Sequence, residues 1–176
     1  MKTFRAGFAL LMLAVLMACS SAQVNMRRGR HNATVGSPGV QQALAALQQD
    51  LISAMGSMKS ALPIYDGNRV RSIRATHAAL VVVDHAMSGA KAPVRERPVV
   101  TDTVASKLAK SHYNASQIMT SQTSMRSGLS SLQDAVRQLN IAVGATPNRQ
   151  GVMVSNHLTK AIAEANAAIA LHGGGA

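Results

Sequence analysis

The chain has 176 residues, 47% of them hydrophobic but only 2% aromatic, and a formal net charge of +11. This length leaves room for one domain, and a core of Ala, Val, Leu, Ile and Met favours closely packed helices. The same composition argues against a β-sandwich, whose strands favour aromatic and β-branched residues. Tyr65 and Tyr113 are too few to interleave aromatic rings with the basic residues for base stacking, which argues against a nucleic-acid partner.

The N-terminus has the pattern of an export signal. Lys2 and Arg5 precede an apolar run from Phe8 to Ala18, which matches the charged and hydrophobic regions of a secretory signal. A membrane-spanning helix needs about 20 apolar residues. The run is therefore too short to span a bilayer, and we expect residues 1–18 to be removed as a signal peptide.

The only cysteine of the chain follows this run directly. Leu16-Met17-Ala18-Cys19 resembles the lipobox of bacterial lipoproteins, with an aliphatic residue three positions before the cysteine and a small residue directly before it. The resemblance implies a diacylglyceryl group on the Cys19 thiol, cleavage between Ala18 and Cys19, and acylation of the new amino group. Two or more acyl chains are sufficient for stable membrane anchoring. The alternative is ordinary signal cleavage after Ser20-Ser21-Ala22, which would discard Cys19.

Residues 19–39 predict a flexible, basic tether, since they lack periodicity and are rich in Arg, Asn, Gly and Pro. Arg27, Arg28 and Arg30 would lie against anionic head groups, at about 1 kcal/mol each. Ser20 stands where an aspartate would retain a lipoprotein at the inner membrane, so the resemblance implies the outer membrane if the bacterium has two.

Loss of the signal leaves 16 basic and 7 acidic residues, a net charge of +9. The expected partners are the membrane itself, anionic polymers of the cell envelope, or another envelope protein. A solvated basic surface without a partner is the alternative interpretation of the charge.

After the tether, apolar residues recur at helical spacing. The first stripe comprises Val40, Leu44, Leu47, Leu51, Met55, Met58 and Leu62. Pro63 cannot continue that helix, and a second helix is expected from about Asp66 to Ser88, ending at Gly89. The segment "GAKAPVRERPVV", with Pro93 and Pro98, predicts an extended linker.

A third apolar pattern begins near Thr101 and comprises Val104, Leu108, Ala115, Ile118, Met125, Leu129, Leu132, Val136, Leu139 and Val143. It predicts one long helix or two, because "TSQTS" at 120–124 consists of weak helix formers. Thr146-Pro147 predicts the start of a last helix that reaches Leu171. Residues 173–176 are expected to be a frayed tail.

The two halves of the region 40–172 resemble each other. Asn68, Arg69, His77 and Asp84 recur 80 positions later as Asn148, Arg149, His157 and Glu164. The preceding helices align at an offset of 81: Leu44 with Met125, Leu51 with Leu132, Ala54 with Ala135 and Met58 with Leu139. Half-repeats of about 40–90 and 101–172 predict an all-α fold, an antiparallel four-helix bundle built from two similar helical hairpins.

His77 and Asp84 interrupt the apolar stripe of the second helix, where they lie seven residues apart. In an up-down-up-down bundle the second and fourth helices run parallel on a diagonal. His77 and His157 would then share one layer, and Asp84 and Glu164 another. One interpretation is a buried polar layer that fixes helix register.

The other interpretation of these residues is a haem or transition-metal site with His77 and His157 as ligands. Against it, residues seven apart on a helix are separated by about 10.5 Å, so His77 and Asp84 cannot share one ion. The sequence also lacks a Cys-x-x-Cys-His motif for covalent haem. We therefore expect no cofactor.

The sequence contains no arrangement of nucleophile and base, and no close pair of carboxylates, that would indicate acid–base catalysis. We expect a non-enzymatic protein with a structural or interaction role. A sensor or inhibitor module that recognises an envelope protein through an exposed apolar groove is a further hypothesis.

Overall fold

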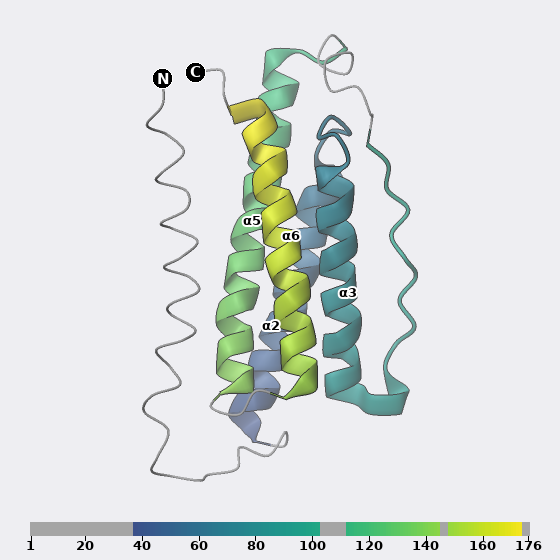
Figure 1. Ribbon diagram of the computed structural model, residues 1–176, viewed down its shortest axis with the longest axis vertical. Coiled ribbons are helices and arrows are strands. Elements are labelled where there is room, and N and C mark those ends of the chain that lie inside the picture. Colours follow the sequence, from purple (N-terminus) through teal and green to yellow (C-terminus); the bar gives the residue numbers. More distant parts are fainter. Residues whose placement is uncertain (1–36, 103–111, 145–147, 174–176) are drawn as a thin grey trace. The chain divides into compact units, whose positions relative to one another are not determined.

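The computed structural model describes residues 37–102, 112–144 and 148–173. Four long helices cover most of these residues: α2 (Pro38–Ser60), α3 (Asn68–Ser88), α5 (Ala115–Val143) and α6 (Arg149–Gly173). A short 3₁₀ turn, η1 (Gly89–Lys91), follows α3 (Figure 1). The described residues contain no β-strand, so the all-α prediction is confirmed.

The helix boundaries follow from local chemistry. The Ser37 side chain accepts a hydrogen bond from the Val40 N–H, and Pro38 occupies the first turn of α2, where its missing N–H costs nothing. Asn114 and Gln117 form a reciprocal capping box at the start of α5. Gly89 follows α3 with a φ of +56°, a backbone conformation that glycine adopts without steric cost.

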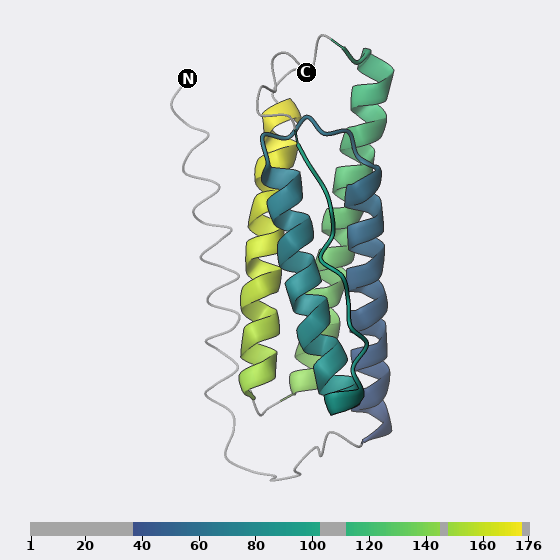
Figure 2. The ribbon, with the colours of Figure 1, turned by 90° about the vertical axis from the view of Figure 1, so that its right-hand side faces the viewer.

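The helices form an antiparallel bundle of two hairpins. α2 pairs with α3, and α5 pairs with α6, while α2 also packs against α5 and α3 against α6. Between the hairpins, residues 92–102, here called the strap, run without helical structure along the length of the bundle (Figure 2). The strap returns the chain to the end where α3 began, so α5 runs in the same direction as α3.

The expected up-down-up-down order of the helices is therefore wrong. The second and fourth helices, α3 and α6, are antiparallel neighbours and not parallel diagonals. The register shows this directly, because the Ser72 hydroxyl donates to the Ala161 carbonyl, and Arg71, one residue earlier, pairs with Glu164, three residues later.

The core is formed by the predicted stripes. Leu44, Leu47, Leu51 and Met58 are buried, and the other members of the first stripe pack against them in partly buried positions. The four residue pairs that align the two hairpins are also buried on both sides: Leu44, Leu51, Ala54, Met58, Met125, Leu132, Ala135 and Leu139. The residues that align the two hairpins in the sequence therefore belong to the buried core in both.

The third pattern forms one helix where the structure describes it. α5 continues through "TSQTS" and carries Ser121 on its buried face. Val104 and Leu108 lie outside the described residues, and helix α5 begins at Ala115, later than the pattern suggested. Thr146-Pro147 also lies outside them, and the described start of α6 is capped by Asn148, whose side chain accepts from the Gly151 N–H at 2.7 Å.

Candidate functional site

The most distinctive polar structure of the bundle is the attachment of the strap to α3. Asp84 on α3 is buried, and its carboxylate accepts a hydrogen bond of 2.7 Å from the Gln48 side chain of α2. Arg95 of the strap donates to both oxygens of the same carboxylate. The bond to Asp84 raises the pKa of Arg95 above its usual value. We call this set, Gln48, Asp84 and Arg95, the lower clamp.

A second salt bridge holds the other end of the strap, and in this one α3 supplies the cation and the strap supplies the anion. Arg69 on α3 is buried, and its Nε lies 2.7 Å from Asp102 of the strap. The same guanidinium donates to the Thr101 carbonyl at 2.7 Å and to the Ala61 carbonyl at 2.9 Å. Arg69 therefore satisfies backbone carbonyls at the end of α2 as well as those of the strap. We call Arg69, Thr101 and Asp102 the upper clamp.

The spacing of the two clamps fits an extended strap. Arg69 and Asp84 lie 15 residues apart on α3, a rise of about 22 Å. Arg95 and Asp102 lie seven residues apart on the strap, and an extended segment of that length spans about 23 Å. Pro93 and Pro98 keep the strap out of helical conformations. Between the clamps Val99 is 97% exposed.

Asp84 and Glu164 do not form the expected carboxylate layer. Asp84 is bound by Gln48 and Arg95 and not by a histidine. Glu164 is only partly buried and pairs with Arg71 near the surface, at 2.8 Å. Because α3 and α6 are antiparallel, Asp84 and Glu164 lie toward opposite ends of the bundle. The interpretation as a shared carboxylate layer is therefore wrong.

His77 lies five residues after Ser72 and His157 lies four residues before Ala161, so the antiparallel register of α3 and α6 places the two histidines at about the same level of the bundle. They differ in the sides of their helices on which they lie. The face of α3 that meets α6 carries Ser72, and His77 is rotated from Ser72 by about 140° around the helix axis. His77 lies two turns before Asp84, on the side of α2 and the strap, while His157 lies one turn before Ala161, on the side of α3. His77 is half-buried, and its buried Nε2 has no hydrogen-bond partner among the described residues.

No group of three or more His, Cys, Asp or Glu side chains in the described ranges is placed to hold a metal ion. Cys19 and the tether residues Arg27, Arg28 and Arg30 lie outside the described residues.

A buried polar cluster lies at the end of the bundle where α3 begins. Tyr65 is fully buried, and its hydroxyl lies 2.7 Å from the Ser121 hydroxyl of α5. The His172 ring meets Tyr65 edge-on with centroids 4.9 Å apart, and its Nε2 lies 2.8 Å from the Ile64 carbonyl. Burial raises the pKa of Tyr65. These contacts fix the α2–α3 turn against α5 and α6.

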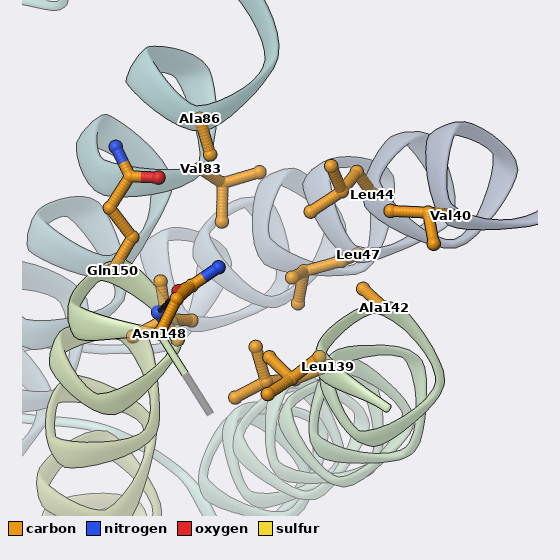
Figure 3. Close-up of a pocket in the computed structure, with 12 residues that line it drawn as sticks. Val40, Leu44, Leu47, Val83, Ala86, Leu139, Ala142, Asn148 and Gln150 are labelled. Atoms are coloured by element: carbon orange, nitrogen blue, oxygen red, sulfur yellow. Dashed lines mark hydrogen bonds between the residues drawn. The ribbon is translucent and has the colours of Figure 1, made fainter. Parts of the chain in front are cut away.

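The opposite end of the bundle contains an apolar cavity of about 70 Å³ (Figure 3). It lies where α2 and α6 begin and where α3 and α5 end. Its apolar walls come from Val40, Leu44, Leu47, Val83, Ala86, Leu139, Ala142, Val143 and Val154, and Asn148 and Gln150 lie at its polar side. The cavity is small, and its lining offers apolar contact without a titratable side chain.

Sequence reasoning missed Arg69, Arg95 and Asp102. Arg69 stood out only as a member of the repeat, directly after the α2–α3 turn, and Arg95 and Asp102 are two of several charged residues in and just after the linker. The sequence pattern does not reveal the path of the linker, and it is this path that brings Arg95 and Asp102 beside α3.

No protein-family model matches the sequence, and no curated protein and no solved structure is significantly similar to it. Within the described ranges, each helix is too short or too polar to cross a bilayer.

Chemically, several buried hydroxyl groups of the described residues hold the fold together. Ser121 binds the Leu62 N–H as well as Tyr65. The Ser72 hydroxyl is bonded to α6, and Thr76 donates to the Ser72 carbonyl within α3. This arrangement stabilises helix pairs and turns. The features that face outward are the strap and the apolar end of the bundle.

Proposed function

We propose that this protein is a bacterial lipoprotein of the cell envelope whose bundle has a structural or protein-binding role without catalysis. Acyl groups on Cys19 hold it on the membrane, the outer one where two are present. The observation that carries the proposal is the lipobox Leu16-Met17-Ala18-Cys19, placed directly after the apolar run and containing the only cysteine of the chain.

The bundle supports the non-catalytic part of the proposal. Asp84 and Arg69, the buried charged residues of α3, are both used to attach the strap. The proposed partners of this protein are the anionic surface of the envelope or another envelope protein. Either partner would contact the outward-facing residues of the bundle.

Metabolic labelling tests the proposal. Cells that produce the chain are fed an alkyne-bearing palmitate, and the purified protein is assayed for the label. We expect label on the natural chain, and a membrane fraction that contains it. In Cys19→Ser both should be lost, because the acceptor thiol is absent, while Ser20→Ala should behave as the natural chain. Equal labelling of Cys19→Ser and the natural chain would contradict the proposal.

A further inference from the structure

The end of the bundle that contains the apolar cavity is also the end at which the preceding chain joins. α2 begins at Pro38, beside the last turn of α3, the last turn of α5 and the first turn of α6 (Figure 3). We call this the proximal end. Cys19 lies 18 residues before Ser37, and 18 residues cannot span more than about 65 Å even when fully extended. An acyl anchor at Cys19 would therefore hold the start of α2, and with it the proximal end, within that distance of the lipid surface.

Acidic side chains are sparse at the proximal end. Aspartate and glutamate are absent from the described ranges 37–49, 85–95, 135–144 and 148–163. Lys91 and Arg149 are exposed there, and neither forms an ion pair with a described residue. Asp84, near the end of α3, is buried and paired with Arg95, and the exposed Glu96 follows Arg95 on the strap. The proximal end therefore presents positive charge.

Exposed apolar side chains accompany these cations. Ile141 in the last turn of α5 is 61% exposed, Val152 in the first turn of α6 is 50% exposed, and Met153 beside it is 41% exposed. Single exposed apolar residues are normal on protein surfaces. Here the exposed apolar residues lie at the same end as Lys91 and Arg149. A surface that combines basic and apolar side chains binds the boundary between lipid head groups and acyl chains.

We infer that the proximal end docks on an anionic phospholipid surface. Lys91 and Arg149 contact the head groups, and Ile141 and Val152 enter the head-group boundary. This inference rests on the proposed function, because the acyl anchor supplies the proximity. The inference adds that the bundle itself contacts the bilayer and that it does so through its proximal end.

The test uses the lipidated full chain reconstituted in vesicles. One set of vesicles is pure phosphatidylcholine, and the other contains one quarter phosphatidylglycerol, which is anionic. Ile141→Cys supplies a thiol for an environment-sensitive fluorophore, since the Cys19 thiol is blocked by the lipid. Met119→Cys is the matched control, because Met119 is exposed in the second turn of α5, at the opposite end of the bundle.

We expect the Ile141 probe to become brighter and blue-shifted in the anionic vesicles and to be quenched by spin-labelled head groups, while the Met119 probe is unchanged. Lys91→Gln with Arg149→Gln should weaken docking about 25-fold, because each basic side chain near an anionic surface contributes about fivefold. Raising the salt concentration to about 1 M should release the probe in the natural sequence, since charges are then screened over about 3 Å.

Flotation of the vesicles separates failure of the docking from failure of the anchor. A chain that floats with both kinds of vesicle, with no change at the Ile141 probe, overturns the docking and leaves the anchor intact. A chain that floats only with anionic vesicles, and shows the probe change, supports the docking and contradicts the anchor. A chain that floats with neither overturns both. Equal changes at the Ile141 and Met119 probes also contradict the proposal, since no end would then be preferred.

Discussion

At the scale of single residues, two charged side chains of α3 attach the strap in opposite senses. α3 supplies the cation of the upper clamp, Arg69, and the anion of the lower clamp, Asp84. Each is buried, and removing one partner of such a pair leaves the other charge in a poorly solvated position. Reversed polarity at the two ends also disfavours attachment of the strap in the opposite direction.

Replacing Arg69 by methionine should lower the free energy of unfolding by about 3–5 kcal/mol, because Asp102 then stays buried without its cation. The carbonyls of Ala61 and Thr101 lose a donor as well. Urea denaturation followed by circular dichroism measures the change. Arg74→Met is the control, because Arg74 is an exposed residue of the same helix, and it should change stability by less than about 0.5 kcal/mol. Equal effects of the two substitutions would contradict this role for Arg69.

Tyr65 gives the bundle a dependence on alkaline pH. Burial raises its pKa above the usual value of 10.0, so the unfolded chain releases the phenol proton at a lower pH than the folded chain does. The stability contributed by the neutral phenol is therefore complete below pH 10 and is lost as the pH rises above it.

The substitution Tyr65→Phe tests this dependence on alkaline pH. The urea midpoints are measured at about pH 8 and about pH 11, on either side of the tyrosine pKa. At the lower pH the variant should lose about 1 kcal/mol, the contribution of its hydrogen bond with Ser121. At the higher pH the difference should shrink or reverse. Tyr113→Phe serves as the control and should keep the natural dependence. A constant deficit of Tyr65→Phe at both pH values would show that the Tyr65 phenol does not contribute to the alkaline loss of stability.

At the scale of helices, α2 and α5 approach each other closely at Gly128. A Cβ atom at this position would lie 2.6 Å from Met58 Cγ and 3.2 Å from the Ala54 carbonyl oxygen. The missing side chain thus allows the backbone of α5 to come near α2, in the same way that small residues allow close packing elsewhere in this aromatic-poor core.

Gly128→Ala should accordingly destabilise the bundle by about 1–3 kcal/mol through overpacking. Gly56→Ala is a matched substitution on α2, where a Cβ would meet nothing within 4 Å. It should stabilise the fold by about 0.5–1 kcal/mol, because alanine is the better helix former. Thermal unfolding of the two variants should therefore shift in opposite directions. A shift in the same direction would show that the α2–α5 contact is not limited by Gly128.

The helices were predictable, whereas their path was not. Pro63 and Gly89 mark the ends of the first two helices in the sequence, and the stripe from Leu44 to Met58 identifies the buried face. Nothing in "GAKAPVRERPVV" states whether the linker crosses the end of the bundle or runs along its length. That choice decides whether α3 and α6 are diagonal or adjacent, and it explains why the expected layer of Asp84 and Glu164 was wrong.

The candidate site shows the same limit. Asp84 was identified because a carboxylate interrupts an apolar stripe, but its partners Gln48 and Arg95 come from other elements. Helical periodicity places a residue on a face and says nothing about which distant segment covers that face. The pairing of Arg69 with Asp102 depends on the same tertiary contact.

At the scale of the whole molecule, the proposed acyl anchor and the helical bundle are expected to act together. The described residues form a helical bundle whose proximal end carries the exposed Lys91 and Arg149, and Leu16-Met17-Ala18-Cys19, which resembles a lipobox, lies earlier in the chain. The docking proposal predicts that the bundle contacts the membrane in addition to the acyl chains proposed for Cys19. Its sensitivity to salt distinguishes this contact from the acyl anchor, whose hydrophobic insertion is insensitive to charge screening.

The lipoprotein proposal requires Cys19 to be the lipidated first residue of the mature chain. The most direct measurement is the intact mass of the protein extracted from membranes of the producing cells in mild detergent. For a lipoprotein we expect a chain that begins at Cys19 and carries a diacylglyceryl group and a further acyl chain. A chain that begins at Gln23 and carries no lipid would contradict it.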